Sequence, residues 1–344
     1  MADEIPPRRR PRYKGTHPRR FEEKYKELEP SRFADEKLKV MARGQTPAGS
    51  HRSIMVDEIL EVLAPRPGES ALDATLGYGG HARALMAKLQ PGGHLVGLDV
   101  DPLELPRTEA RLREEGFGEA IFSARRMNFA GLPGLLPETG PFDLVLADLG
   151  LSSMQIDNPA RGFTYKADGP LDLRMNPHRG RPASEWLASL SEQSLADLLE
   201  TNADEPFAKE IADALLHSPE PVRSTRQFAD LVRGALLAQG FDRAAPETRK
   251  SLQRCFQALR IAVNDEFGVL DQFLGFLPKA LNPGGRVAIL SFHSGEDRRV
   301  KKAFLEGHRQ GLYSAIAESP QRPSPEEQRD NPRSSPAKLR WARK

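Results

Sequence analysis

The stretch that decides the fold is Ser70-Ala-Leu-Asp-Ala-Thr-Leu-Gly-Tyr-Gly-Gly-His-Ala82, a short apolar strand followed by a glycine-rich turn and the start of a helix. Further strands are expected at residues 94–99, 120–123, 142–148 and 285–292, with helical segments between them. Strands that alternate with helices of about 10–15 residues indicate a parallel sheet with crossover helices. The sequence therefore predicts an α/β fold with a Rossmann-like, doubly wound sheet.

The strand pattern is interrupted between residues 151 and 242, where only helical periodicity is visible. In residues 225–238 one helical face carries the apolar side chains Phe228, Leu231, Val232, Ala235 and Leu236. We interpret this stretch as an all-helical subdomain inserted into the sheet domain. One long helix, residues 252–277, is expected to return the chain to the sheet.

The predicted division of the chain has four parts. The sheet domain comprises residues 41–151 and 252–318, and the helical insert comprises residues 152–251. Residues 1–40 are predicted to be a disordered basic arm, since the first 20 residues hold six Arg, one Lys and four Pro. The arm either binds phosphate groups of a nucleic acid or is a solvated tail without a partner. Residues 319–344 form a Pro-rich C-terminal segment, expected to be irregular over residues 319–336.

Composition excludes several classes of protein. The 344 residues hold 50 Lys and Arg against 48 Asp and Glu, a formal net charge of +2. A single cysteine, Cys255, excludes an internal disulfide and a cysteine-based metal cluster, so no metal is expected. There is neither an apolar run of 18 residues nor an apolar N-terminal signal, so we expect a cytoplasmic protein without a membrane partner.

The glycine-rich turn has the features of a nucleotide-cofactor site. Gly77 and Gly79 allow a tight turn and close approach of the backbone to a ligand. Asp99 ends the next strand, 20 residues after Gly79, where a carboxylate can accept both hydroxyls of a ribose.

The sequence of the turn alone does not identify the cofactor, because Gly77-x-Gly79-x-x-Ala82 also fits the dinucleotide-binding pattern. Asp73 favours S-adenosylmethionine (SAM), since a carboxylate before the glycines would repel a pyrophosphate but attract the positive amino group of SAM. An NAD-linked enzyme remains the alternative. In the structural interpretation, Asp73 only caps the turn and the glycines only shape it.

Two further polar residues follow strands. Asp148 ends the strand at residues 142–148, and His293 follows the strand at residues 285–292. Ligands of parallel sheets bind at the carboxyl ends of the strands. We therefore expect Asp73, Asp99, Asp148 and His293 to line one crevice, although each of them alone could be a turn residue.

The run Asp148-Leu-Gly-Leu-Ser-Ser-Met-Gln-Ile-Asp157 and the block from Arg161 to Met175 resemble the MraW family, the ribosomal RNA small subunit methyltransferase H enzymes. The resemblance extends over residues 51–340. Further matching segments are Gly79-Gly-His81, Phe207-Ala-Lys209, Phe256-Gln-Ala-Leu-Arg-Ile261, Val263-Asn264, Ser291-Phe-His-Ser294 and Glu296-Asp-Arg298.

The resemblance implies a class I, SAM-dependent methyltransferase that modifies the exocyclic N4 of a cytidine in the decoding region of small-subunit (16S) rRNA, with the ribosomal subunit as partner. It implies SAM contacts at Gly79, Gly80, His81, Asp99, Phe129, Asp148 and Gln155. The sequence departs from the family at Lys250–Arg254, at Glu210 and at Gly295, all on the expected substrate side.

A cytosine amino group is a poor nucleophile because its lone pair is delocalised, and it must lose a proton on methylation. Asp148 is predicted to orient the amine or the cofactor, and His293 to remove the proton or contact RNA. Four arginines could bind phosphates, namely Arg161, Arg174, Arg179 and Arg181, or the first two could form internal ion pairs. A methyltransferase for another RNA or other substrate, and a non-catalytic rRNA-binding assembly factor, stay open as alternatives.

Overall fold

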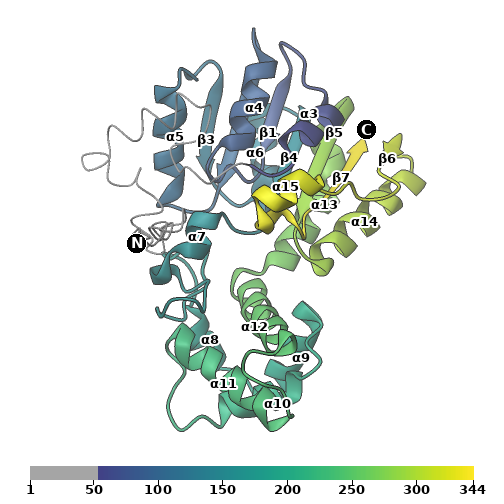
Figure 1. The fold of residues 1–344 in the computed structure, drawn as a ribbon. Coiled ribbons are helices and arrows are strands. Elements are labelled where there is room, and N and C mark those ends of the chain that lie inside the picture. Colours follow the sequence, from purple (N-terminus) through teal and green to yellow (C-terminus); the bar gives the residue numbers. More distant parts are fainter. Residues whose placement is uncertain (1–52) are drawn as a thin grey trace, which may run out of the picture. The chain divides into compact units, whose positions relative to one another are not determined.

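The computed structural model describes residues 53–344 (Figure 1). The predicted basic arm, residues 1–40, lies outside the described residues, and so do residues 41–52 of the predicted sheet domain. Over the described part of the chain, no helix combines the length and apolar character needed to cross a bilayer.

A seven-stranded sheet with the order β3-β2-β1-β4-β5-β7-β6 organises the fold. Strands β1 to β5 pair in parallel, and β7 runs antiparallel to both of its neighbours. The strands are β1 Ser70–Asp73, β2 His94–Asp99, β3 Phe122–Arg126, β4 Phe142–Asp148, β5 Leu281–Ser291, β6 Ala315–Ile316 and β7 Lys338–Arg343. This topology confirms the expected Rossmann-like class I methyltransferase sheet, and its strand order reverses between β1 and β4.

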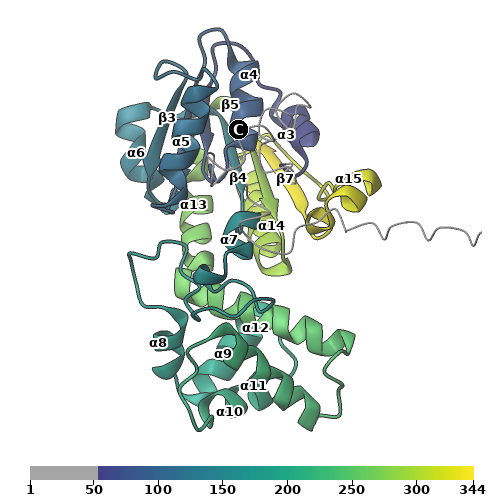
Figure 2. The ribbon, with the colours of Figure 1, turned by 60° about the vertical axis from the view of Figure 1, so that its left-hand side comes forward.

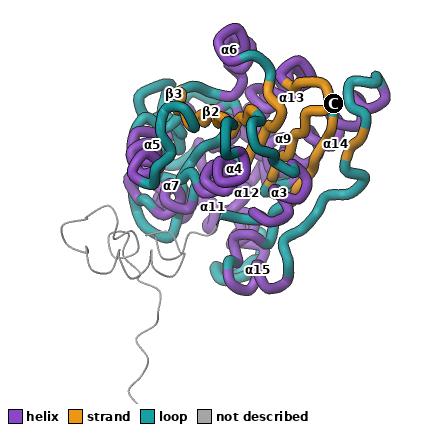
Figure 3. Tube along the Cα trace, turned by 90° about the horizontal axis from the view of Figure 1, so that it is seen from above, coloured by secondary structure: helices purple, strands orange, loops and turns teal. Residues whose placement is uncertain are grey.

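Helices cover both faces of the sheet (Figure 3). Alternate residues of β4 and β5 point to opposite faces, so Val145 joins the core on one side and Leu144 the core on the other. One core is completed by α3 Val56–Leu63, α4 Gly80–Leu89 and α5 Glu104–Glu114. The other is completed by α6 Leu132–Thr139, α13 Glu266–Ala280 and α14 Ser294–Arg309. Burial on both faces explains why these strands are continuously apolar.

The expected helical insert is present and has its own apolar core, drawn from residues between Phe163 and Leu259. Apart from one bridge between Pro170 and Ser224, the stretch from β4 to β5 is built from helices and loops. Figures 1 and 2 show α9 to α12 packed on one another. The helices are α7 Ser153–Asp157, α8 Ala183–Ala188, α9 Glu192–Ala203, α10 Ala208–Leu216, α11 Thr225–Ala238 and α12 Pro246–Asn264.

The expectation of one long helix over residues 252–277 is wrong. The chain turns at Asp265, which adopts a left-handed conformation (φ 49°) and separates α12 from α13. The backbone N–H of Asp265 caps α12 by donating to the carbonyls of Ala262 and Ile261. Aspartate tolerates this conformation better than most residues, so helical periodicity continues in the sequence while the axis changes.

The C-terminal segment is more regular than its composition suggests, so the expectation for residues 319–336 is wrong in part. Helix α15, Pro325–Asp330, begins with the side chain of Ser324 accepting a hydrogen bond from Glu327 N, and proline is compatible with a first helical turn. The last residues form β7 beside β5, with Leu339 and Ala342 buried in the two cores. A segment assigned no strand from sequence therefore completes the sheet.

Candidate active site

The predicted polar residues meet at the carboxyl ends of adjacent strands. Asp73 of β1 is paired in register with Gly97 of β2 and Leu146 of β4, so Asp99 and Asp148 lie two residues farther along the neighbouring strands. The turn after β1 binds both neighbours, because Gly77 N donates to Asp99 Oδ2 at 2.9 Å and Asp148 N donates to Thr75 Oγ1 at 2.6 Å.

The glycines of this turn have a steric role. Gly77 and Gly79 have φ values of 49° and 76°, a region that favours glycine. A Cβ atom on Gly79 would lie 3.1 Å from side-chain atoms of Thr108 and Leu112, and one on Gly80 would overlap Ser53 Oγ. The backbone at the start of α4 is therefore packed as closely as glycine permits.

The site concentrates negative charge in a buried place. Burial raises the pKa of Asp73 to about 6, with smaller contributions from the charges of Asp148 and Asp99, while His81 opposes the shift. Burial likewise raises the pKa of Asp99 to about 6, against hydrogen bonds from Asp101 N and Gly77 N. The pKa of Asp148 is also raised, by burial first and by the charge of Glu296. Three carboxylates in this arrangement favour a ligand that carries positive charge.

His81 contributes from the first turn of α4. Its Nε2 lies 2.9 Å from the carbonyl oxygen of Ile54, and its Nδ1 lies 3.5 Å from Asp148 Oδ2. The imidazole is buried. His81 therefore ties the loop before α3 to the carboxylate at the end of β4.

Several buried polar atoms lack a hydrogen-bond partner among the described residues. At the strand ends they are Oδ1 of Asp148, the last residue of β4, and both ring nitrogens of His293, which follows the adjacent strand β5. Buried polar atoms without partners are rare in folded proteins and mark places where a ligand, water or ion binds. A ligand that carries N–H donors would satisfy such acceptor atoms.

Gln155 and Phe129 have well-defined surroundings. The side chain of Gln155 accepts a hydrogen bond from Ser152 N at 3.0 Å and donates to Asp101 Oδ2 at 2.9 Å. The Phe129 ring packs 5.0 Å from the ring of Phe273 and remains partly exposed. Their contacts with a cofactor stay predictions.

The interpretation of an ion pair within the arginine-rich block is confirmed for Arg174, whereas Arg161 forms its ion pair with Asp101, outside that block. Arg161 is buried and its Nη1 lies 2.7 Å from Asp101 Oδ2. Arg174 binds Asp172 through Nε and Nη2, both at 2.7 Å. By contrast, Arg179 and Arg181 are exposed. The expectation that Arg161 binds phosphate is wrong, since its guanidinium is enclosed and charge-paired.

Two functional candidates are absent from the predicted set. Asp101 is fully buried and joins Gln155 to Arg161, and Glu296 is 3% exposed beside His293. The signal for Glu296 was its place three residues after His293 at the start of a helix, a spacing typical of helix capping. Nothing local in the sequence marks Asp101 as a partner of residue 161.

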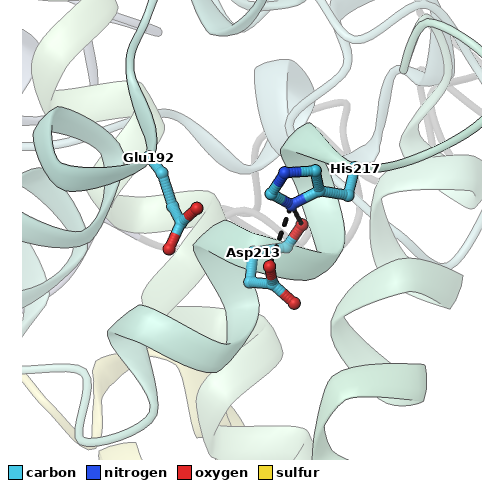
Figure 4. Close-up of side chains that lie close together, drawn as sticks. All are labelled: Glu192, Asp213 and His217. Carbon is cyan, nitrogen blue, oxygen red and sulfur yellow. Dashed lines mark hydrogen bonds and ion pairs between the residues drawn. The ribbon is translucent and has the colours of Figure 1, made fainter.

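A cluster of possible metal ligands lies on the helical insert. Figure 4 shows Glu192 of α9 near Asp213 of α10 and His217, the residue that follows α10, with His217 Nδ1 2.8 Å from Asp213 Oδ1. All three side chains are exposed, and they belong to helices that do not contribute to the strand ends. We assign them no part in the site.

Comparison with known proteins shows which family of proteins this chain is similar to. A family model described as the MraW methylase family matches residues 48–344. The chain is 52% identical over 337 residues to ribosomal RNA small subunit methyltransferase H 2 of Alkaliphilus metalliredigens, with 97% of both chains covered. It is 49% identical to ribosomal RNA small subunit methyltransferase H 1 of Lachnoclostridium phytofermentans, over 97% of this chain and 92% of that one. Among solved structures, a putative rRNA methylase from Clostridium thermocellum gives a TM-score of 0.40 at 13% identity, covering 85% of this chain and 98% of the other.

Proposed function

Since the chain belongs to the MraW methylase family, we propose that it is a SAM-dependent enzyme that methylates the exocyclic N4 of a cytidine in the decoding region of small-subunit rRNA. The relatives with 52% and 49% identity are named as ribosomal RNA small subunit methyltransferases, which supports rRNA as the substrate class. A ribosomal subunit as substrate would place the enzyme in the cytoplasm.

SAM fits the residues at the strand ends. We propose that it is held by Asp73, Gly77, Gly79, Gly80, His81, Asp99, Phe129, Asp148 and Gln155. The fit rests on two features, the tightly packed glycines at the start of α4 and the buried carboxylates, which a ligand with ammonium and sulfonium charges would stabilise. When bound, SAM supplies an electrophilic methyl group.

One observation supports an amino group as the group that receives the methyl. The buried atoms Asp148 Oδ1 and His293 Nδ1 have no hydrogen-bond donor among the described residues. An exocyclic amine has two N–H bonds, one for each atom. In our proposal Asp148 orients the amine by accepting one hydrogen bond, and His293 takes up the proton that methylation releases.

Reaching a cytosine amino group requires the base to leave its stack. We propose that the helical insert, residues 152–251, forms the surface that binds the surrounding RNA, with the exposed Arg179 and Arg181 near phosphates. The insert has its own apolar core, which supports a separate RNA-binding role for it. Helix α12 contributes to that core as far as Leu259.

Nucleoside mass spectrometry of small-subunit rRNA tests the function. RNA from a strain that lacks the gene is compared with RNA from the same strain carrying the wild-type or the Asp148→Asn gene. We expect N4-methylcytidine at one decoding-region position only with the wild-type gene. If the modification is the same with and without the gene, the proposed substrate is wrong, and if the purified protein fails to bind SAM in calorimetry, a non-catalytic assembly role replaces it.

A further inference from the structure

His293 lies at the N-terminal end of α14, directly after β5, with both ring nitrogens buried. Its Nε2 lies 3.1 Å from Glu296 Oε1, an ion-pair contact without hydrogen-bond geometry, and neither ring nitrogen has a hydrogen-bond partner in the described part of the chain. The two nitrogens of an imidazole have different roles, and the partner of one decides whether the other carries a proton.

Glu296 is held in place on its other side. Its Oε2 accepts a hydrogen bond from Phe292 N at 2.8 Å, and the side chain is almost completely buried. Although burial acts in the opposite direction, the contacts with His293, Arg260 and Phe292 N lower the pKa of Glu296. The residue facing His293 is therefore a fixed carboxylate.

A second ion pair lies close to the Glu296 carboxylate. Arg260 at the end of α12 binds Glu266 at the start of α13 through Nε at 2.7 Å and Nη2 at 2.8 Å. Burial lowers the pKa of Arg260, but the charge of Glu266 and its hydrogen bond raise it further than that, and the charge of Glu296 adds to the increase. The carboxylates of Glu296 and Glu266 and the guanidinium of Arg260 together carry one net negative charge. A protonated imidazole of His293 would balance that charge.

Packing restricts the imidazole ring as well. The Phe267 ring centroid lies 5.9 Å from that of the His293 ring and 3.6 Å from Cζ of Arg299. A Cβ atom on Gly295 would lie 2.5 Å from Phe267 Cζ and 3.2 Å from His293 Nδ1. The absence of a side chain at Gly295 therefore leaves the space that Phe267 fills.

We propose that Glu296 is a positioning residue that holds His293 with Nε2–H directed at its carboxylate, so that Nδ1 is the proton acceptor for the amine that becomes methylated. This inference rests on the proposed function. The amine nitrogen gains a bond to the methyl carbon, whose bond to sulfur breaks with its electron pair. One N–H bond of the nitrogen breaks as the Nδ1–H bond forms, Glu296 balances the imidazolium charge, and the proton passes to water on product release.

The first test is Glu296→Gln in the full-length enzyme, assayed on small subunits from the strain that lacks the gene. The amide can still accept from Phe292 N, but its NH2 group would face Nε2 and favour the tautomer with Nδ1 protonated. We expect kcat at saturating SAM to fall by about a hundredfold or more, with little change in KM for either substrate.

The pH profile separates positioning from folding. The charged groups near His293 are Glu296 and Arg299 of α14, and the ion pair of Arg260 of α12 with Glu266 of α13. Because a carboxylate stabilises the protonated imidazole, its removal should move the acidic limb of the kcat profile to lower pH. An unmoved limb in an active Glu296→Gln enzyme would overturn the proposal.

A double-mutant cycle gives an independent readout. If Glu296 acts through His293, Glu296→Gln combined with His293→Ala loses no more activity than His293→Ala alone, whereas multiplied losses contradict the proposal. Glu306→Gln, an exposed change on the same helix, is the matched control and should leave kcat unchanged. If Glu296→Gln fails to fold, Glu296→Asp replaces it, because this variant keeps the negative charge. Glu296→Asp should lower kcat and leave the acidic limb of the kcat profile in place. A shift of that limb would contradict the proposal. A wild-type enzyme that does not methylate the subunits refutes the proposed function instead.

Discussion

Arg161 Nη1 lies 2.7 Å from Asp101 Oδ2, and both side chains are buried although the residues are 60 positions apart. The same guanidinium donates through Nη2 to the carbonyl oxygen of Met175 at 2.7 Å, and Met175 N donates to Asn264 Oδ1 at 2.8 Å. Asp101 N in turn donates to Asp99 Oδ1 at 2.8 Å. One buried ion pair thus joins the predicted ribose carboxylate to the start of the insert and the end of α12.

Arg161→Met is expected to destabilise the fold, because it leaves the Asp101 carboxylate buried without its cation. Losses of this kind are about 3–5 kcal/mol, measured as the free energy of unfolding in urea. Arg179→Met, which removes an exposed guanidinium, should cost less than about 0.5 kcal/mol. Equal effects of the two substitutions would contradict the structural role of Arg161.

RNA affinity should depend on the exposed arginines of the insert. In binding measurements over a series of salt concentrations, Arg179→Gln and Arg181→Gln are each expected to reduce the slope of log K against log salt by about 0.7–0.9. Arg309→Gln, an exposed change at the end of α14, serves as control and should leave the slope unchanged. If neither insert variant changes the slope, those arginines do not contact phosphates.

The carboxyl of Asp73 should couple stability and SAM affinity to pH. Its pKa is raised from an ordinary value of 3.8 to about 6 in the fold, so the folded form binds the proton more tightly than the unfolded form. Its contribution to stability is therefore present at low pH and is lost as pH rises from about 4 to 6. A cationic ligand has the opposite preference, because it favours the carboxylate.

Asp73→Asn therefore should raise the melting temperature of the ligand-free enzyme at pH 7.5 by about 3 °C and weaken SAM binding at least tenfold. In wild-type enzyme, calorimetry should show SAM affinity falling as pH drops from 7 to 5, and the variant should lose part of that dependence. The pKa of Asp99 is also raised to about 6, so Asp99→Asn should remove a further part of the pH dependence of SAM affinity. Unchanged affinity in the Asp73 variant would exclude this residue from the cofactor site.

Gly295→Ala tests the packing around His293, the proposed proton acceptor. Its methyl group would lie 2.5 Å from Phe267 Cζ, so the Phe267 ring or the imidazole must move. We expect kcat to fall by roughly tenfold while SAM binding is retained. The double variant Gly295→Ala with Phe267→Leu should recover activity, because the shorter side chain vacates the space. Gly234→Ala, where nothing lies within 4 Å, should be neutral or slightly stabilising.

Local patterns in the sequence were sufficient to predict the core of this fold. Apolar runs such as residues 142–148 and the glycine turn after Asp73 are short-range features, and the rules of parallel sheets place the residues at the carboxyl end of every strand along one edge. Those rules predicted that Asp73, Asp99, Asp148 and His293 would share that edge, and predicted the helical insert from its uniform periodicity.

Tertiary structure alone decided which partners the polar residues have. The break at Asp265 depends on one backbone conformation that helical periodicity does not report, and β7 exists because an edge of β5 is available to it. Arg161 is paired with Asp101 across 60 positions of the chain. Charge type can be read from sequence, but burial and pairing depend on contacts between distant segments, and these determine whether an arginine binds RNA or holds the enzyme together.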